Sequence, residues 1–335
     1  MTTLIDQFNR HHRYLRISLT DRCNLRCVYC MPAEGLRWIP HEDILTKDEV
    51  VYLARSFVDL GIEHIRLTGG EPTIRKGLLD IVSALSQLDG LKDLSMTTNA
   101  LTLAKLAPRL KQSGLKRLNI SIDSLQAERF SVLTRGGKLQ KVLDGIDAAH
   151  KVGFGTIDAP IKLNIVVIAG KNDDEIMDFV HYASEHPAVI EPRFIEYMPF
   201  GSRLHQNTHS QSLRDQLAEY TPLTPLIKNS LHTGPASYFR VTGYGINVGF
   251  ISPISNRFCA TCNRLRLSAH GDLRACLAKE AHPTLRSVIR NPAHTPENVK
   301  ELIQQIVWGK VKGHQCATED KTPIPFEGVM TRIGG

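Results

Sequence analysis

Six of the seven cysteines in this 335-residue chain occur as two groups of three. Three thiolates can hold a [4Fe–4S] cluster and leave its fourth iron open to bind another molecule. The spacing therefore favours two iron–sulfur clusters, each with one open iron. The first group, called the first triad below, is Cys23, Cys27 and Cys30, and the second triad is Cys259, Cys262 and Cys276.

Two other uses of these cysteines fit less well. Disulfides are not expected, because residues 1–13 lack the apolar core of an export signal and the number of cysteines is odd. A structural zinc ion takes four ligands, whereas each triad offers three, and a site shared between the triads would leave two cysteines unexplained. Cys316 stands apart, and the sequence assigns it no role.

Two arginines follow Cys262 closely. In an extended segment Cys262, Arg264 and Arg266 have the same parity, so their side chains point to the same side. Two guanidinium groups beside an open cluster suit a polyanion, because each can form paired hydrogen bonds to its oxygens. The alternative is a pair of surface arginines on a hairpin.

Extended and helical segments alternate between the two triads. Six strand–helix units of this length predict a parallel sheet covered by helices, either as an open doubly wound sheet or as a partial barrel. Strands are expected at 14–19, 62–68, 94–98, 117–122, 162–168 and 193–197, and helices at 47–60, 78–88, 103–112, 139–152 and 174–185.

Distinctive motifs directly follow four of these strands. Loops at the carboxyl ends of parallel strands build the active sites of such folds, so we expect the motifs to lie together. They occupy residues 21–30, 69–72, 97–99 and 123–124.

The pattern changes after residue 199. Residues 200–235 are rich in Ser, Thr, His, Gln and Pro and predict a linker or covering loop with a short helical patch at 213–219. Short strands dominate 237–277, where a hairpin at 270–272 would bring Cys276 back toward Cys262. Helices are expected at 284–290 and 297–308, and the chain is divided into a core, 1–235, and a C-terminal region, 236–335.

Composition argues against several other classes of protein. No apolar run approaches the roughly 18 residues of a membrane helix, so we expect no membrane partner and a cytoplasmic location. The net charge of +7 favours anionic partners, but aromatic residues are only 6% and basic residues form no block, so no nucleic-acid surface is expected. The phosphate-loop motif is absent, and Gly243-Tyr244-Gly245 does not open a helix.

Together these motifs resemble a known family. The first triad, with Tyr29 before its third cysteine, resembles the signature of radical S-adenosylmethionine enzymes, and Thr-Gly-Gly-Glu-Pro at 68–72 resembles their second motif. The second triad, the Asn-Arg-Leu-Arg run at 263–266 and the terminal Ile-Gly-Gly at 333–335 narrow the resemblance to the GTP 3′,8-cyclase family of molybdenum cofactor biosynthesis. One departure is Ala100, where a glycine is expected.

The resemblance implies a fold and a first cofactor site. The fold would be a partial (β/α)6 barrel with a C-terminal α+β region that carries the second cluster. The first cluster would bind S-adenosylmethionine and reduce it to methionine and a 5′-deoxyadenosyl radical, and Gly69 and Gly70 would allow close backbone approach to the methionyl part. From their context alone Ser121 and Met198 would be core-facing strand residues. The implied S-adenosylmethionine contacts are Tyr29, Gly69, Gly70, Glu71, Ser121 and Met198.

The resemblance also implies GTP as the substrate, with its guanine against the second cluster. The radical would remove the C3′ hydrogen, a step that requires no side-chain acid or base. The C3′ radical would add to C8, and one electron and a proton would complete (8S)-3′,8-cyclo-7,8-dihydroguanosine 5′-triphosphate. Charges within strands fit a triphosphate better than a packed core, where unpaired charges are costly. The implied GTP contacts are Arg16, Arg66, Thr97, Lys162, Arg264 and Arg266, and the tail glycines Gly334 and Gly335 would thread into the site.

Other functions remain open from the residues alone. A radical enzyme with an auxiliary cluster could instead modify a peptide or RNA, although no extra binding module or basic tail is visible. An iron–sulfur sensor would have no use for residues 69–72 beside the first triad, and a zinc-stabilised structural protein is the third candidate. The expected partners are an electron-donor protein and a second copy of the chain in a homodimer.

Overall fold

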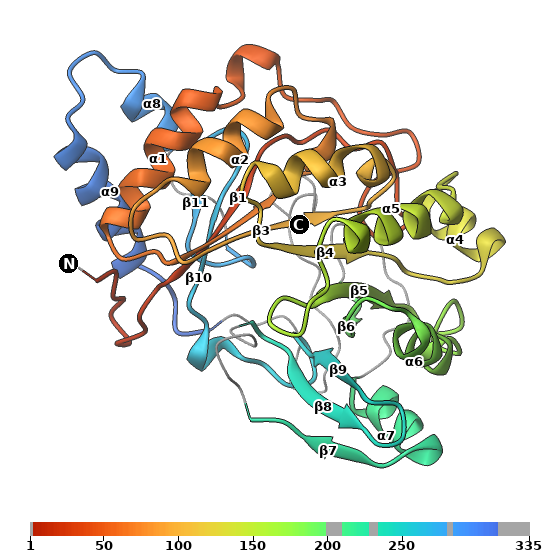
Figure 1. Ribbon diagram of the computed structural model, residues 1–335. Helices are drawn as coiled ribbons and strands as arrows, with labels where there is room; N and C mark the ends of the chain where they lie inside the picture. The colour runs from red at the N-terminus through yellow and green to blue at the C-terminus, as the bar shows by residue number, and fades with distance from the viewer. Residues whose placement is uncertain (1–2, 199–209, 228–233, 280–283, 314–335) are drawn as a thin grey trace.

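The computed structural model describes residues 3–198, 210–227, 234–279 and 284–313. Six parallel strands form its centre, and helices alternate with them along the chain, with both α4 and α5 between β4 and β5 (Figure 1). The strands are β1 (Tyr14–Ser18), β2 (His64–Thr68), β3 (Asp93–Thr98), β4 (Arg117–Ser121), β5 (Ile161–Val167) and β6 (Ile190–Glu196). The helices are α1 (Lys47–Asp59), α2 (Leu78–Ser86), α3 (Leu103–Gln112), α4 (Ala127–Thr134), α5 (Leu139–Lys151) and α6 (Ile176–Glu185).

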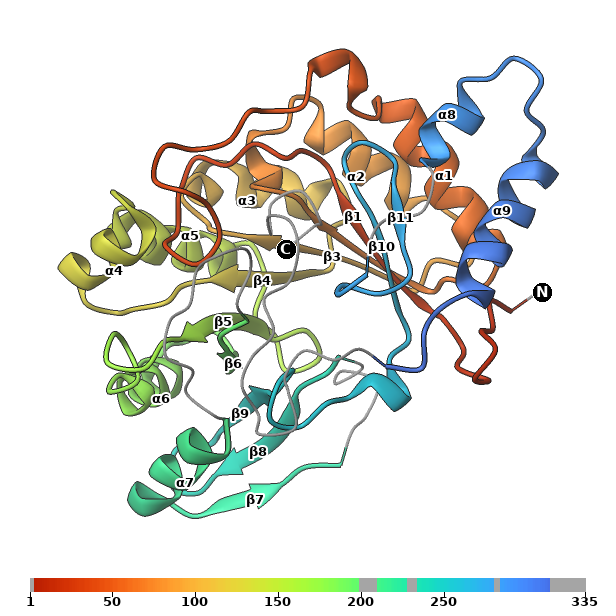
Figure 2. The same cartoon turned by 180° about the vertical axis from the view of Figure 1, so that it is seen from behind.

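The C-terminal elements extend the same sheet at both edges. The strand order is β11-β10-β1-β2-β3-β4-β5-β6-β9-β8-β7, in which β10 pairs in parallel with β1 and β9 pairs in parallel with β6. Figure 2 shows the β10–β11 hairpin beside β1. These elements are α7 (Ser210–Tyr220), β7 (Leu223–Pro225), β8 (Ser237–Val241), β9 (Ile246–Ile251), β10 (Arg264–Leu267), β11 (Leu273–Arg274), α8 (Leu285–Ile289) and α9 (Pro296–Trp308).

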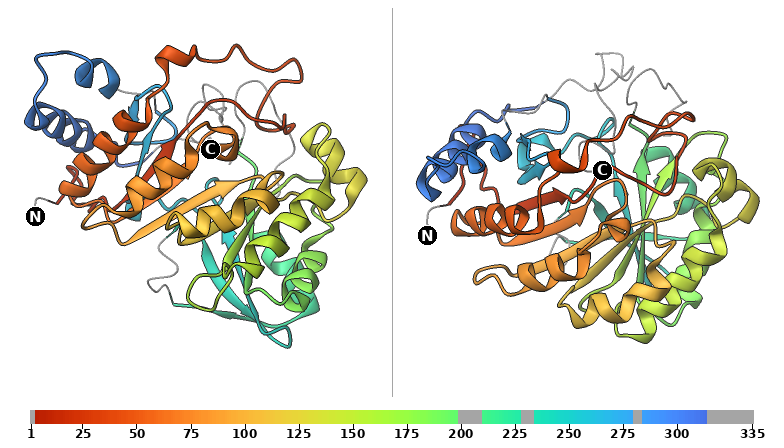
Figure 3. Two further views of the ribbon diagram at one scale, coloured as in Figure 1. Left: turned by 45° about the horizontal axis from the view of Figure 1, so that its top comes forward. Right: turned by 90° about the horizontal axis from the view of Figure 1, so that it is seen from above.

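The sheet is curved and covered by α1 to α6 on its outer side, as the view from above shows (Figure 3). The two ends of the strand order are β11 and β7, so the barrel stays open between them. The fold is therefore the partial (β/α)6 barrel with additional C-terminal strands that the resemblance implied.

Alternation along the strands separates the core from a polar lumen. In β1, Leu15 and Ile17 are fully buried in the hydrophobic core, whereas Arg16 between them lines the central pocket. In β2, Ile65 and Leu67 are likewise in the core. Because successive strand residues point to opposite faces, one face packs against the helices and the other carries the polar side chains of the site.

Most of the expected elements are confirmed within a few residues. Helix α4 was not among the expected ranges. The helical patch expected at 213–219 is confirmed as α7, but the same segment also contributes the strand β7, which was not expected. Since β7 pairs with β8, the two parts of the chain on either side of residue 235 share one sheet. The division at that residue remains a prediction.

Candidate active site

One central pocket of about 320 Å³ collects both cysteine triads. Its volume falls in the range of small-molecule sites. The tail glycines Gly334 and Gly335 lie outside the described residues. All other site residues expected from the sequence line this pocket: Cys23, Cys27, Cys30, Cys259, Cys262, Cys276, Tyr29, Gly69, Gly70, Glu71, Ser121, Met198, Arg16, Arg66, Thr97, Lys162, Arg264 and Arg266.

The first triad lies on the loop that follows β1. A turn in which Cys30 N–H donates to Cys27 O (2.9 Å) brings these two cysteines to the same side of the loop. Cys23 Sγ accepts a hydrogen bond from Leu25 N (3.4 Å) and faces the amide Nδ2 of Asn99 at 3.9 Å. Burial raises the pKa of Cys23 to about 11 and also raises that of Cys27, so these thiols need a metal to become thiolates at neutral pH.

Gly69 and Gly70 are required by the chain's own packing. A Cβ on Gly70 would lie 2.2 Å from Arg22 O, and one on Gly69 would lie 2.6 Å from Thr20 O. The backbone N–H of Gly70 donates to Thr20 O (2.7 Å). The two glycines therefore let the loop after β2 dock directly on the loop that leads into the first triad, a role that sequence reasoning missed because it depends on this contact.

Glu71 ties the loops after β2 and β3 together. Its carboxylate accepts hydrogen bonds from Thr73 N (3.0 Å), Thr73 Oγ1 (2.6 Å), Thr98 Oγ1 (2.6 Å) and Asn99 N (2.7 Å). Burial raises the pKa of Glu71. Ala100, which follows Asn99 in the loop after β3, has a φ of +60°. This left-handed conformation favours glycine, which explains why a glycine was expected at this position.

Tyr29 links the first triad to the end of β4. Its hydroxyl donates to Asp123 Oδ2 (2.8 Å), and Asp123 Oδ1 accepts from Val166 N (2.9 Å). Burial raises the pKa of Asp123 to about 6. Ser121 and Met198 are half-buried and line the pocket, so the core-facing position suggested by their context alone is wrong.

The second triad is assembled by the expected hairpin. Strands β10 and β11 pair antiparallel with Arg266 opposite Arg274, and Gly271 in the turn has a φ of +94°. Burial would raise the pKa of Cys262, but the charges of Arg264 and Lys310 outweigh it and lower this pKa to about 6. The parity prediction is confirmed: Arg264 and Arg266 line the pocket beside Cys262, and the alternate residue Leu265 is fully buried in the core.

Some buried polar atoms that line the pocket have no hydrogen-bond partner. Among the described residues, the Nε atoms of Arg16 and Arg266 and Oγ1 of Thr97 are buried without a hydrogen-bond partner. Burial and the neighbouring Arg264 lower the pKa of Arg266 to about 10, and burial and Arg266 lower that of Arg16. Unsatisfied buried donors cost about 1–3 kcal/mol each, so these groups fit a bound anion.

Lys162 extends this cationic surface to β5. Its Nζ lies 3.6 Å from Glu191 Oε2 and 5.3 Å from the ring centre of Tyr238. Burial and the nearby Arg193 lower the pKa of Lys162 to about 7. Arg193 on β6 also lines the pocket and donates to Asn164 Oδ1. Arg193 was not among the expected site residues. The argument that charged strand residues fit a bound triphosphate better than a packed core applies to it as well and would have identified it.

The geometry also bears on the zinc alternative. Across the part of the chain that the structure describes, no three His, Cys, Asp or Glu side chains are placed to share a single metal ion. In a [4Fe–4S] cluster each thiolate binds a different iron, so the three sulfurs of a triad need not meet at one point.

Comparison with known proteins gives the family. The model of the Radical SAM superfamily matches residues 17–183, and that of Molybdenum Cofactor Synthesis C matches residues 190–316. The GTP 3′,8-cyclase of Listeria monocytogenes is 44% identical, with 100% of both chains covered. That of Lactiplantibacillus plantarum is 42% identical, again over 100% of both. The chain belongs to the GTP 3′,8-cyclase family. As a member of this cyclase family it is a radical S-adenosylmethionine enzyme.

A solved structure agrees with the cyclase fold. SuiB of Streptococcus suis, bound to S-adenosylmethionine, superposes with a TM-score of 0.63 at 14% identity, covering 93% of this chain and 70% of that one. At this identity the likeness shows the fold alone. No helix in the described ranges of this cyclase-family chain is both long and apolar enough to span a membrane.

Proposed function

We propose that this chain converts GTP to (8S)-3′,8-cyclo-7,8-dihydroguanosine 5′-triphosphate, the first step of molybdenum cofactor biosynthesis. The observation that carries the proposal is one pocket lined by two cysteine triads and by Arg16 and Arg266, whose buried Nε atoms have no acceptor among the described residues. Such a pocket suits one redox cofactor at each end and a polyanion in the middle. The names of the relatives point to the same substrate.

The residues of the first triad would hold one [4Fe–4S] cluster, and those of the second triad another. When bound, the first cluster would supply the electron that cleaves S-adenosylmethionine, and the second would bind the guanine of GTP through its open iron. The docked glycine loop would fix the backbone around S-adenosylmethionine, together with Tyr29, Ser121 and Met198. Glu71 would act mainly through the loops that it ties together, since both its oxygens already accept hydrogen bonds.

The cations of the lumen would hold the triphosphate. Arg264 and Arg266 would approach it from β10, and Arg16, Arg66 and Lys162 from β1, β2 and β5, with Thr97 contributing a hydroxyl. These side chains start from rigid strands, so they would fix the ribose in one orientation between the two clusters. Cyclisation within one nucleotide is mainly a positioning task, for which such a fixed geometry is suited.

The proposal includes a protein electron donor, a homodimeric assembly and a cytoplasmic location. A reducing compartment keeps thiols available as cluster ligands, which supports that location. The alternative of a peptide- or RNA-modifying enzyme is not favoured, because the family's named substrate is GTP.

Cysteine variants test the division of labour between the triads. Cys23→Ala should abolish cleavage of S-adenosylmethionine, because the first cluster supplies the electron. Cys262→Ala should retain slow, GTP-independent cleavage but form no cyclised product. The measurement is anaerobic turnover with reductant, with 5′-deoxyadenosine and cyclised nucleotide quantified together. Equal loss of cleavage in both variants would refute the two-cluster assignment.

A further inference from the structure

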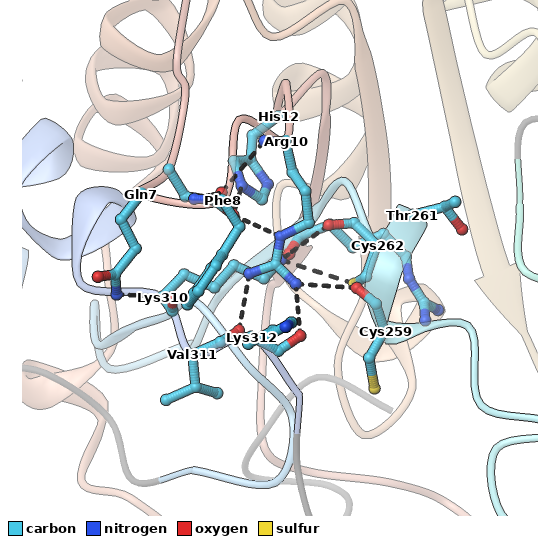
Figure 4. Close-up of polar contacts among 12 residues, drawn as sticks. Gln7, Phe8, Arg10, His12, Cys259, Thr261, Cys262, Lys310, Val311 and Lys312 are labelled. Atoms are coloured by element: carbon cyan, nitrogen blue, oxygen red, sulfur yellow. Dashed lines mark hydrogen bonds and ion pairs between the residues drawn. The ribbon is translucent and has the colours of Figure 1, made fainter.

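Lys310, two residues after α9, is a buried cation at the second triad. Only 3% of the surface of this residue is exposed to solvent. As Figure 4 shows, its Nζ points to the backbone and sulfur of Cys262, at 3.2 Å from the carbonyl oxygen and 3.6 Å from Sγ, and it also donates to Arg264 O at 2.9 Å. Within the described ranges Lys310 forms no ion pair with a carboxylate. The sulfur of Cys262 is thus the anionic group that Lys310 faces.

Two residues near the N-terminus, Asp6 and Arg10, hold the segment that carries Lys310; we call them the N-terminal hook. Arg10 donates to Cys259 O (2.8 Å), Val311 O (2.7 Å) and Lys312 O (3.0 Å), and so joins the second triad to the segment after α9 (Figure 4). Its Nε is paired with Asp6 Oδ2 at 2.7 Å, and both residues are buried. Since the arginine is bonded on all sides, the backbone that carries Lys310 has little freedom relative to Cys262.

The contacts of Cys23 in the first triad differ from those of Cys262. The donors to Cys23 Sγ are neutral, the backbone N–H of Leu25 and the side-chain amide of Asn99. Two buried carboxylates are bonded to neighbours of this triad. Glu71 accepts a hydrogen bond from Asn99 N, and Asp123 accepts one from the Tyr29 hydroxyl. Carboxylates are thus bonded to neighbours of the first triad, whereas a lysine is bonded to Cys262 of the second.

We propose that Lys310 is a positioning residue that raises the reduction potential of the second cluster through its contact with Cys262 Sγ. The inference rests on the proposed two-cluster function. On reduction the cluster takes up one electron and no bond is formed or broken, so a nearby cation stabilises the reduced, more negative state. Hydrogen bonds to ligand sulfurs and local charge set the potentials of such clusters, and charge-assisted hydrogen bonds are about twice as strong as neutral ones.

The test uses the full-length chain with Cys23→Ala, Cys27→Ala and Cys30→Ala, so that only the second cluster gives a signal. Its midpoint potential is measured anaerobically by titration with dithionite, followed by electron paramagnetic resonance. In this background Lys310→Gln removes the charge but keeps a hydrogen-bond donor for the carbonyl oxygens of Cys262 and Arg264. Lys310→Met removes both the charge and the donor. Both should shift the potential to more negative values, whereas Lys310→Arg should stay close to the parent. Lys105→Met, which removes an exposed charge on α3 outside the pocket, is the control and should cause no shift.

Each result decides a different claim. An unchanged potential in Lys310→Gln would overturn the role of Lys310, even if Lys310→Met lost its iron. A background chain that binds no iron at the second triad would overturn the two-cluster function as well. The reciprocal chain, with Cys259→Ala, Cys262→Ala and Cys276→Ala, should show the same first-cluster potential with and without Lys310→Gln. An equal shift there would show a general structural effect and refute a specific contact with Cys262.

Discussion

The residues around the two triads differ most clearly in charge. Burial raises the pKa of Cys23 to about 11, whereas Arg264 and Lys310 overcome the effect of burial at Cys262 and lower its pKa to about 6. A low potential is useful where a sulfonium must be reduced, and a positive surface is useful where a triphosphate must bind. The side chains thus support the different tasks that we propose for two sets of cysteines that look alike in the sequence.

The arginines of β10 provide the most direct test at this scale. Arg264→Ala or Arg266→Ala should weaken GTP binding by about 1.5–3 kcal/mol each, the loss expected for a hydrogen bond to a charged group. This corresponds to roughly a ten- to hundred-fold higher Kd in calorimetry or equilibrium dialysis. Binding of guanosine, which lacks phosphates, should change little. The control is Arg240→Ala on β8, because Arg240 is exposed and bonded to Asn247. Unchanged GTP affinity in both β10 variants would refute the assignment of Arg264 and Arg266 to the triphosphate.

Lys162 should make nucleotide binding depend on pH. Its pKa of about 7 in the unliganded protein means that it is largely neutral at pH 8. A bound triphosphate favours the charged form, so this pKa rises on binding and a proton is taken up. Affinity should therefore fall as pH rises above about 7, by at most about tenfold per pH unit for one proton.

Calorimetry of GTP binding at pH 8, in buffers with different heats of ionisation, measures this uptake. The expected value approaches about one proton per nucleotide, and Lys162→Met should remove it. Proton release, or uptake that is unchanged in Lys162→Met, would contradict the role of this lysine.

At the scale of elements, loops after neighbouring strands are locked together before any cofactor binds. The loop after β2 docks on the first-triad loop through Gly70 N and Thr20 O (2.7 Å), and Glu71 joins it to the loop after β3. The cluster site is therefore held by rigid backbone contacts, as accurate positioning of a reactive cofactor demands.

Gly70→Ala should break this arrangement. The new Cβ would lie 2.2 Å from Arg22 O, a backbone atom that cannot move without displacing the first-triad loop. We expect a loss of at least about 2 kcal/mol in chemical unfolding of the apoprotein, as for other overpacked sites. Iron bound at the first triad should fall while that at the second is kept. Gly309→Ala, whose Cβ would have no neighbour closer than 3.7 Å, should stay within about 0.5 kcal/mol of the wild type; equal stability of the two variants would contradict the docking argument.

Sequence patterns predicted the elements better than the reasons for individual residues. Strand–helix alternation and side-chain parity correctly located β1 to β6 and the inward side of Arg264 and Arg266, because both depend on neighbours in the chain. The docking of Gly70 and the contact between Lys310 and Cys262 could not be predicted, since each joins segments distant in sequence. Arg193 was predictable in principle but was passed over.

At the scale of the whole molecule, the C-terminal strands complete the pocket. β10 adds to the β1 edge of the barrel and β9 to the β6 edge, so residues from both ends of the chain line one lumen. The hook at Arg10 and the segment after α9 then close on the second triad. A single continuous sheet thereby supports a pocket that is lined by both triads and by the arginines of its strands.

The central claim is that both triads act on one bound GTP, and isotope transfer tests it most directly. Anaerobic, reduced protein is incubated with S-adenosylmethionine and GTP carrying deuterium at C3′, and the 5′-deoxyadenosine formed is analysed by mass spectrometry. Deuterium should appear in 5′-deoxyadenosine together with cyclised product, whereas Cys262→Ala should give only unlabelled 5′-deoxyadenosine. Cyclised product accompanied by only unlabelled 5′-deoxyadenosine from the wild-type chain would contradict the account.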